Sequence, residues 1–162
     1  MIESGLSNWA LSNPAIQPFL GNADPQRVQP FTSFYFSFLP KNQVLPAIVL
    51  DRLRSPDEID TLDARTSAPG TPIEGHFQFG SVAEDSAKNP ANASGYLSAC
   101  LLSQQLRRQL TGLASGNAAL PDGTLIKDVY GWDEFDAHYE VGGGGYLLRR
   151  VLLVTIVFQE TS

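Results

Sequence analysis

One long segment, residues 92–113, has apolar residues that recur at helical spacing. Steps of three or four residues place their side chains on a single face of an α-helix. These residues are Gly95, Ala99, Leu102, Leu106, Leu110 and Leu113. Asn92 or Ser94 can cap the start of the helix, and Gly116 can end it. The segment is therefore predicted to be an amphipathic helix that packs against a sheet.

A second strip of side chains on the same predicted helix lies away from that face. Leu97 and Leu101 lie about 140° and about 100° round the helix axis from the main face, at roughly 100° per residue. Arg107 and Arg108 are also off the main face. We expect this side of the helix to meet a second neighbour, either the N-terminal helix or another subunit. The two arginines could pair with acids of the loop from Asp57 to Asp63 in a neighbouring subunit, and the alternative is simple solvation.

Strands are predicted where apolar residues alternate with polar ones or form short continuous runs. The predicted strands cover residues 31–39, 47–54, 73–82, 124–141 and 146–159. A short connection joins the first two, so they are expected to form a hairpin. Gly131 would allow a bulge in the fourth strand. The last strand is apolar on both sides, which predicts a central position or cover by another chain.

The order of these elements predicts an α+β fold. Residues 6–20 predict a short N-terminal helix that Pro14 and Pro18 break or shorten. We expect a mostly antiparallel sheet with one long helix and this short helix packed on one face. The length of 162 residues fits a single domain, residues 1–162. Within it, residues 55–72 are rich in acidic residues, Pro, Ser and Thr, which predicts a long mobile loop.

Composition argues against several classes of function. The net charge of −6 disfavours direct binding of nucleic acid, since phosphate contacts need Lys and Arg. No apolar run approaches the ~20 residues of a membrane-spanning helix. The N-terminus lacks the basic and apolar regions of a secretory signal, so a cytoplasmic origin is expected. A single cysteine, Cys100, rules out an internal disulfide and any multi-cysteine metal site.

Patterns that could support catalysis or metal binding are weak. The glycines at 142–145 join two strands and lead into no helix, which predicts a hairpin turn rather than a phosphate loop. His76 and His138 could meet across neighbouring strands, but partly exposed strand histidines are the simpler interpretation. Acids near His138 could perform acid–base chemistry in a pocket, although a solvated strand end is more common. They are Asp133, Glu134, Asp136 and Glu140. We therefore predict no enzyme activity, no metal and no cofactor.

Several local patterns, taken with the order of elements, resemble the phage tail completion or tail terminator family of siphophages, prophages and gene transfer agents. The resemblance covers most of the chain, from about Arg27 to Phe158. The matching pieces are a helix ending near Gly21, then Arg27-Val28, Pro40 with residues 45–50, the strand 74–79, the Leu102-Leu106-Leu110 spacing, and residues 148–156.

This resemblance implies a structural virion subunit rather than an enzyme. Members form a ring, typically hexameric, which caps the head-proximal end of the tail tube, ends tube polymerisation and docks the head connector. The implied partners are copies of the chain itself, the tail tube protein and the connector or neck protein. DNA would pass through without specific binding, and no membrane is involved. The implied location is the tail–neck junction of the virion, after assembly in the bacterial cytoplasm.

Two alternatives to a tail terminator stay open. One is another neck protein or a minor tail or baseplate subunit. The other is a small α+β ligand-binding or enzyme domain, whose site would include His138 and the acids around it. Under the terminator interpretation we expect the 55–72 loop to contact the tube or a neighbouring subunit. The candidate subunit or tube contacts are Leu97, Leu101, Arg107, Arg108, Asp57, Glu58, Asp60, Asp63, Arg65, Arg149 and Arg150.

Overall fold

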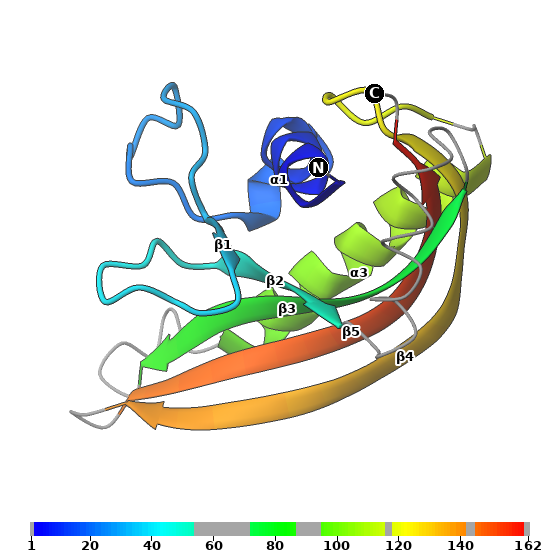
Figure 1. The fold of residues 1–162 in the computed structure, drawn as a ribbon. Helices are drawn as coiled ribbons and strands as arrows, with labels where there is room; N and C mark the ends of the chain where they lie inside the picture. Colours follow the sequence, from blue (N-terminus) through cyan, green and yellow to red (C-terminus); the bar gives the residue numbers. More distant parts are fainter. Residues whose placement is uncertain (1, 54–71, 87–94, 116–117, 142–144, 161–162) are drawn as a thin grey trace.

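The computed structural model describes residues 2–53, 72–86, 95–115, 118–141 and 145–160. These residues form α1 (Ile2–Ser12), the 3-10 helix η1 (Gln17–Phe19), β1 (Phe34–Phe36), β2 (Ala47–Leu53), β3 (Ile73–Ser86), α3 (Gly95–Ser115), β4 (Leu125–Val141) and β5 (Gly145–Gln159). Figure 1 shows a curved sheet with α1 and α3 on its concave side. The α+β fold that the sequence predicts is confirmed.

The sheet has the strand order β1-β2-β3-β5-β4. β5 pairs in antiparallel fashion with both β3 and β4, which confirms the central position predicted for the last strand. β1 and β4 are the two edges. The register of β4 shifts between Tyr130 and Asp133, where Gly131 has a φ of +73°. Glycine adopts this backbone region without steric cost, so the predicted bulge is also confirmed.

The predicted apolar face of α3 is buried along its whole length. All six of its members are buried, and Leu102, Leu106 and Leu110 have no exposed surface. This face packs mainly on β3 and β5. Ile2 and Leu6 of α1 belong to the same buried cluster, so both helices share one core with the sheet.

The predicted hairpin between the first two strands is wrong. β1 covers only Phe34–Phe36 and pairs with β2 in parallel. The chain turns away at Ser37, which has a φ of 65°, and the following residues carry it back to the start of β2. Phe34 is 7% exposed, whereas Phe38 is 73% exposed, because the pairing stops before the aromatic alternation does.

Other boundaries differ by a few residues. α1 starts at Ile2 rather than Leu6 and ends at Ser12, before Pro14. β3 continues to Ser86, beyond the predicted end at residue 82, because its backbone pairs with β5 as far as Gly145. Nearly all of the predicted 55–72 loop lies outside the described residues. None of the helices that the structure describes is both long and apolar enough to cross a membrane.

Candidate functional site

A groove of about 750 Å³ runs between α3 and the strands β4 and β5, and we call it the α3 groove. It is lined by Leu97, Cys100, Leu101, Gln104, Arg107, Arg108, Thr111, Glu134 and Arg150. Five of these are residues that the sequence predicts to make subunit contacts: Leu97, Leu101, Arg107, Arg108 and Arg150. The groove therefore brings together side chains from two separate predicted segments.

The second strip of α3 lines this groove because the main apolar face is turned onto the sheet. Leu97 remains 54% exposed, and Leu101 is half-buried. Tyr96, beside Leu97, is 50% exposed. Tyr96 and Leu97 therefore retain apolar surface that burial against a partner would stabilise, by about 25 cal/mol for each Å² removed from water.

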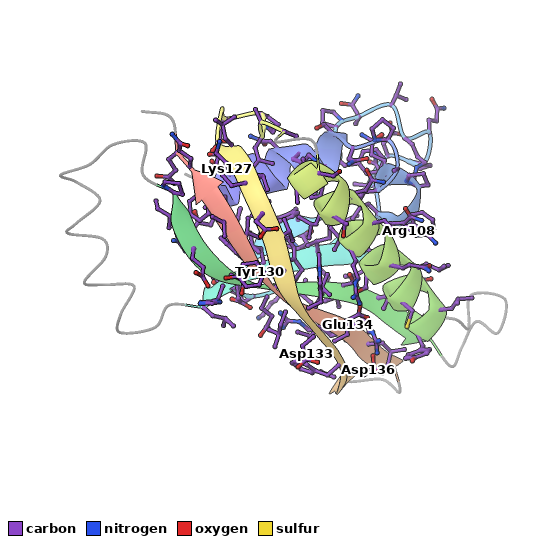
Figure 2. The ribbon with its side chains drawn as sticks, turned by 90° about the vertical axis from the view of Figure 1, so that its right-hand side faces the viewer. Arg108, Lys127, Tyr130, Asp133, Glu134 and Asp136 are labelled. Atoms are coloured by element: carbon purple, nitrogen blue, oxygen red, sulfur yellow. The ribbon has the colours of Figure 1, made fainter. Side chains whose placement is uncertain are left out.

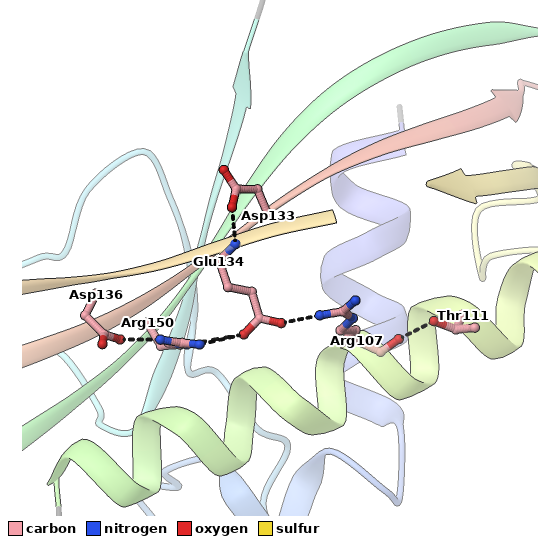
Figure 3. A network of polar contacts seen from close by, with 6 residues as sticks. All are labelled: Arg107, Thr111, Asp133, Glu134, Asp136 and Arg150. Carbon is pink, nitrogen blue, oxygen red and sulfur yellow. Dashed lines mark hydrogen bonds and ion pairs between the residues drawn. The ribbon is translucent and has the colours of Figure 1, made fainter. Parts of the chain in front are cut away.

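A chain of ion pairs forms one wall of the groove (Figure 3). Arg150 of β5 donates from Nη1 to Asp136 Oδ1 at 2.9 Å and from Nη2 to Glu134 Oε2 at 2.9 Å. Arg107 of α3 donates from Nη1 to Glu134 Oε1 at 2.7 Å. The Arg107 guanidinium also lies 5.1 Å from the centre of the Trp132 ring. These ion pairs, which we call the ion chain, join α3, β4 and β5 through the shared carboxylate of Glu134.

Alternation along the strands explains which charges enter this chain. In β4, Glu134 and Asp136 are two residues apart and face α3, whereas Asp133 turns to the other side of the sheet (Figure 2). Arg149 and Arg150 separate in the same way. Arg149 lies 3.4 Å from Asp51 of β2 on the convex face.

The ion chain shifts the pKa values of two of its members, Glu134 and Arg150. Partial burial of Glu134 favours its neutral form, but hydrogen bonds from Arg107 and Arg150 outweigh this effect and hold its pKa below the ordinary value. The hydrogen bond to Asp136 and the pairing with Glu134 outweigh desolvation and raise the pKa of Arg150. Both groups therefore carry full charge at neutral pH.

Tyr96 lies at the start of α3, next to Leu97 of the groove but not among the residues that line it. A hydrogen bond with Cys100, one helical turn on, is the main cause that raises the pKa of Tyr96. The negative charge of Asp136 adds to this effect, and Arg150 opposes it. The sequence predicted neither the interaction of Tyr96 with Cys100 nor the contact of Trp132 with Arg107, both of which border the groove. The spacing of Tyr96 and Cys100 is a signal for the first, whereas Trp132 follows a bulge that sequence periodicity cannot place.

Arg108 differs from the other cations of the groove. Its side chain is exposed on α3 (Figure 2), and within the described residues it forms neither a hydrogen bond nor an ion pair. The predicted acidic contacts are Asp57, Glu58, Asp60 and Asp63, with Arg65 beside them, and all of them lie outside the described residues. Their pairing with Arg107 or Arg108 stays a prediction, although Arg107 already has Glu134 as a partner.

The two histidines do not meet. His76 lies opposite Thr155 of β5, and its Nδ1 is 3.0 Å from Thr155 Oγ1. His138 is in register with Leu148, far along the same strand, because β5 separates β3 from β4. Among the residues that the structure describes, no three His, Cys, Asp or Glu side chains gather as a metal site.

The convex face has a smaller hollow that the sequence did not predict. It has a volume of about 360 Å³ and is lined by residues including Leu53, His76, Leu153 and Thr155.

Comparison with known proteins finds no family model that matches the chain and no curated protein with significant similarity. The features of the chain itself therefore carry the functional argument.

Proposed function

We propose that the protein is a structural subunit of a phage tail, which caps the head-proximal end of the tail tube as a ring, ends tube polymerisation and docks the head connector. The observation that carries the proposal is the α3 groove. There, a core helix leaves Leu97 exposed and Arg108 without a described partner, beside an ordered chain of ion pairs. An apolar strip next to a cation that has no partner among the described residues favours a protein neighbour.

A ring requires two different surfaces on each subunit, because every copy contacts its neighbours head to tail. The α3 groove lies beside β4, at one edge of the sheet. A second exposed apolar region lies near the other edge, where Phe36 of β1 is 46% exposed and Phe38 is 73% exposed. Two unlike surfaces at opposite edges support a heterologous contact rather than a symmetric dimer.

The charge of the chain also suits such a ring. The net charge is −6 at pH 7. Because DNA phosphates are repelled by negative surfaces, DNA could travel through a ring of these subunits without being held.

The proposal is tested by assembly in the phage or prophage that encodes the chain. Loss of the gene should give uncapped tails that do not join heads, as seen by electron microscopy, and the wild-type gene should restore joining. A Leu97→Ser, Leu101→Ser variant should fold but not restore joining. The matched control is Phe135→Ser, since Phe135 is a large hydrophobic residue that is 45% exposed on β4 outside the groove.

Two results would contradict the proposal. The first is normal, joined particles in the absence of the gene. The second is a wild-type protein that remains monomeric in sedimentation at high concentration and also caps no tubes.

A further inference from the structure

Two apolar side chains stand at the tips of loops near β1. Val28 is 75% exposed and Phe38 is 73% exposed, the largest values among the large hydrophobic residues that the structure describes. Each follows a residue with positive φ, Arg27 at 59° and Ser37 at 65°. Residues other than glycine adopt this region at a cost of roughly 1–3 kcal/mol, which commonly occurs where function requires it.

The Val28 tip is held by one carboxylate. Asp24 accepts hydrogen bonds from three backbone N–H groups, those of Gln26 at 3.0 Å, Val28 at 2.9 Å and Gln29 at 3.0 Å. These bonds, from Gln26 and Gln29 foremost, lower the pKa of Asp24, so it stays charged. The tip therefore presents a branched apolar side chain with a negative charge beside it.

Arg27 fixes the same tip from the other side. Its Nη2 donates to the carbonyl oxygens of Gln17 at 2.5 Å and Leu20 at 2.9 Å. Its guanidinium lies 5.0 Å from the centre of the Phe31 ring. These contacts offset the cost of its backbone conformation, so Val28 is displayed by an ordered turn.

The Phe38 tip is fixed by a tight turn. The N–H of Phe38 donates to the carbonyl of Phe36 at 2.8 Å, which closes a γ-turn around Ser37. The N–H of Ser37 donates to Leu50 of β2 at 3.0 Å, so the turn is attached to the sheet. Figure 1 shows the loop after η1 and the loop after β1 both projecting from the side of the molecule where β1 lies.

We infer that the Val28 and Phe38 tips insert into the α3 groove of a second copy of this chain. Val28 and Phe38 would lie against Leu97 and Leu101, and Asp24 would pair with Arg108. The inference rests on the proposed function, because the ring supplies the second copy.

Three observations support this occupant. The apolar tips match the apolar part of the groove, which at about 750 Å³ has room for one aromatic and one branched side chain. Asp24 beside Val28 complements Arg108, a cation without a described partner. β1 and β4 are opposite edges of the sheet, so a copy placed beside β4 of another can present its own β1 edge. Such a contact uses the groove of one copy and the tips of the next. Each copy then has its other surface available for a further copy, so the contact propagates head to tail.

A photo-crosslinking experiment tests the contact directly. Phe38 is replaced by benzoylphenylalanine, and this protein is mixed with ¹⁵N-labelled wild-type chain under conditions in which the wild type self-associates. After irradiation, mass spectrometry should find ¹⁴N–¹⁵N crosslinks from position 38 to residues 97–108. The same substitution at Phe135 is the matched control and should give none to that segment.

Solution affinity gives an independent readout. Val28→Ser and Phe38→Ser should each weaken self-association by about tenfold or more, as sedimentation measures it, whereas Phe135→Ser should not. Circular dichroism should show all three variants folded, since the side chains are exposed.

The outcomes separate the two proposals. Rings that form normally with both tip variants, or crosslinks that reach only another surface, overturn the inference and leave the ring function standing. A wild-type chain that never self-associates, either alone or on tail tubes, overturns both.

Discussion

The concave face of the sheet is covered differently on the two sides of α3. On one side α1 closes the core and buries Ile2, Leu6 and Ala10 completely. On the other side the described residues leave the α3 groove open beside β4, crossed by the ion chain from Asp136 to Arg107. The apolar face of α1 completes the interior, whereas charged side chains on β4 keep the second side hydrated and available.

The ion pairs on the two sides of α3 also differ in how far water reaches them. Arg52 of β2 lies 3.3 Å from Glu3 of α1, with side chains that are 12% and 16% exposed. The Arg52 guanidinium also lies over the rings of Phe77 and Phe158. In the groove, the Arg107 side chain is 47% exposed. Water screens the second pair far more than the first, so it contributes less to stability.

The largest expected effect comes from matched truncations of two helix leucines. Leu6→Ala should lower the free energy of unfolding by about 2–5 kcal/mol, because Leu6 is fully buried on the inner face of α1. Leu97→Ala should change it by less than about 0.5 kcal/mol, since alanine favours helix and Leu97 is mostly exposed. Urea unfolding of the two variants measures the difference. Equal losses would mean that the groove is part of the interior.

The partly buried ion pair of Glu3 and Arg52 should rank second. Glu3→Gln leaves Arg52 with a weaker acceptor where little water reaches, so we expect a loss of about 1–3 kcal/mol in thermal or urea unfolding. Glu84→Gln is the control, because Glu84 is exposed on β3. A Glu3 variant as stable as the Glu84 variant would show that α1 is held by apolar contacts alone.

The ion chain of the groove should give a smaller, pH-dependent effect. Glu134→Gln should cost about 0.5–1 kcal/mol at pH 7 and low salt. The pKa of Glu134 is lowered in the folded chain, so its contribution is present above the ordinary pKa and lost as the pH falls through the folded value. Stability curves of wild type and variant should therefore converge in acid. Parallel curves down to the acid limit would rule out this role for the carboxylate.

The smallest effect concerns Tyr96. Its raised pKa means that the phenol ionises at higher pH than an ordinary tyrosine, and Cys100→Ala should move the ionisation back toward the ordinary value. NMR of ring-labelled tyrosine measures this shift when the wild type and the variant are titrated side by side. An unchanged Tyr96 titration in the variant would mean that the hydrogen bond to Cys100 is not formed in solution.

Sequence periodicity correctly predicted the elements that bury one regular face in the core. The α3 face was correct at every member because a helix of that length has one way to bury its leucines. The strand predicted at residues 73–82 was also confirmed, and its alternation places Phe77 and Phe79 in the core and leaves His76 on the more exposed face. In these segments local pattern and tertiary packing demand the same arrangement.

Other features depended on pairing that no local pattern encodes. The aromatic alternation after Ser33 predicted a longer strand, but parallel pairing with β2 ends at Phe36 and leaves Phe38 in solvent. The acids of β4 were predicted as one cluster, yet strand alternation sends Asp133 to the face opposite Glu134. Arg107 and Arg150 share the carboxylate of Glu134 only because α3, β4 and β5 lie side by side in the fold. Spacing along the sequence does not show this arrangement.

The central position of β5 has a consequence for how the chain folds. β3 pairs with β5 along its whole length, from Ile73 opposite Phe158 to Ser86 opposite Gly145. While α3 can form from local contacts, β3 has an unsatisfied backbone edge until residues 145–159 arrive between it and β4. The sheet therefore closes late, and during synthesis the exposed edge of β3 is the part of the nascent chain most open to pairing with the wrong strand.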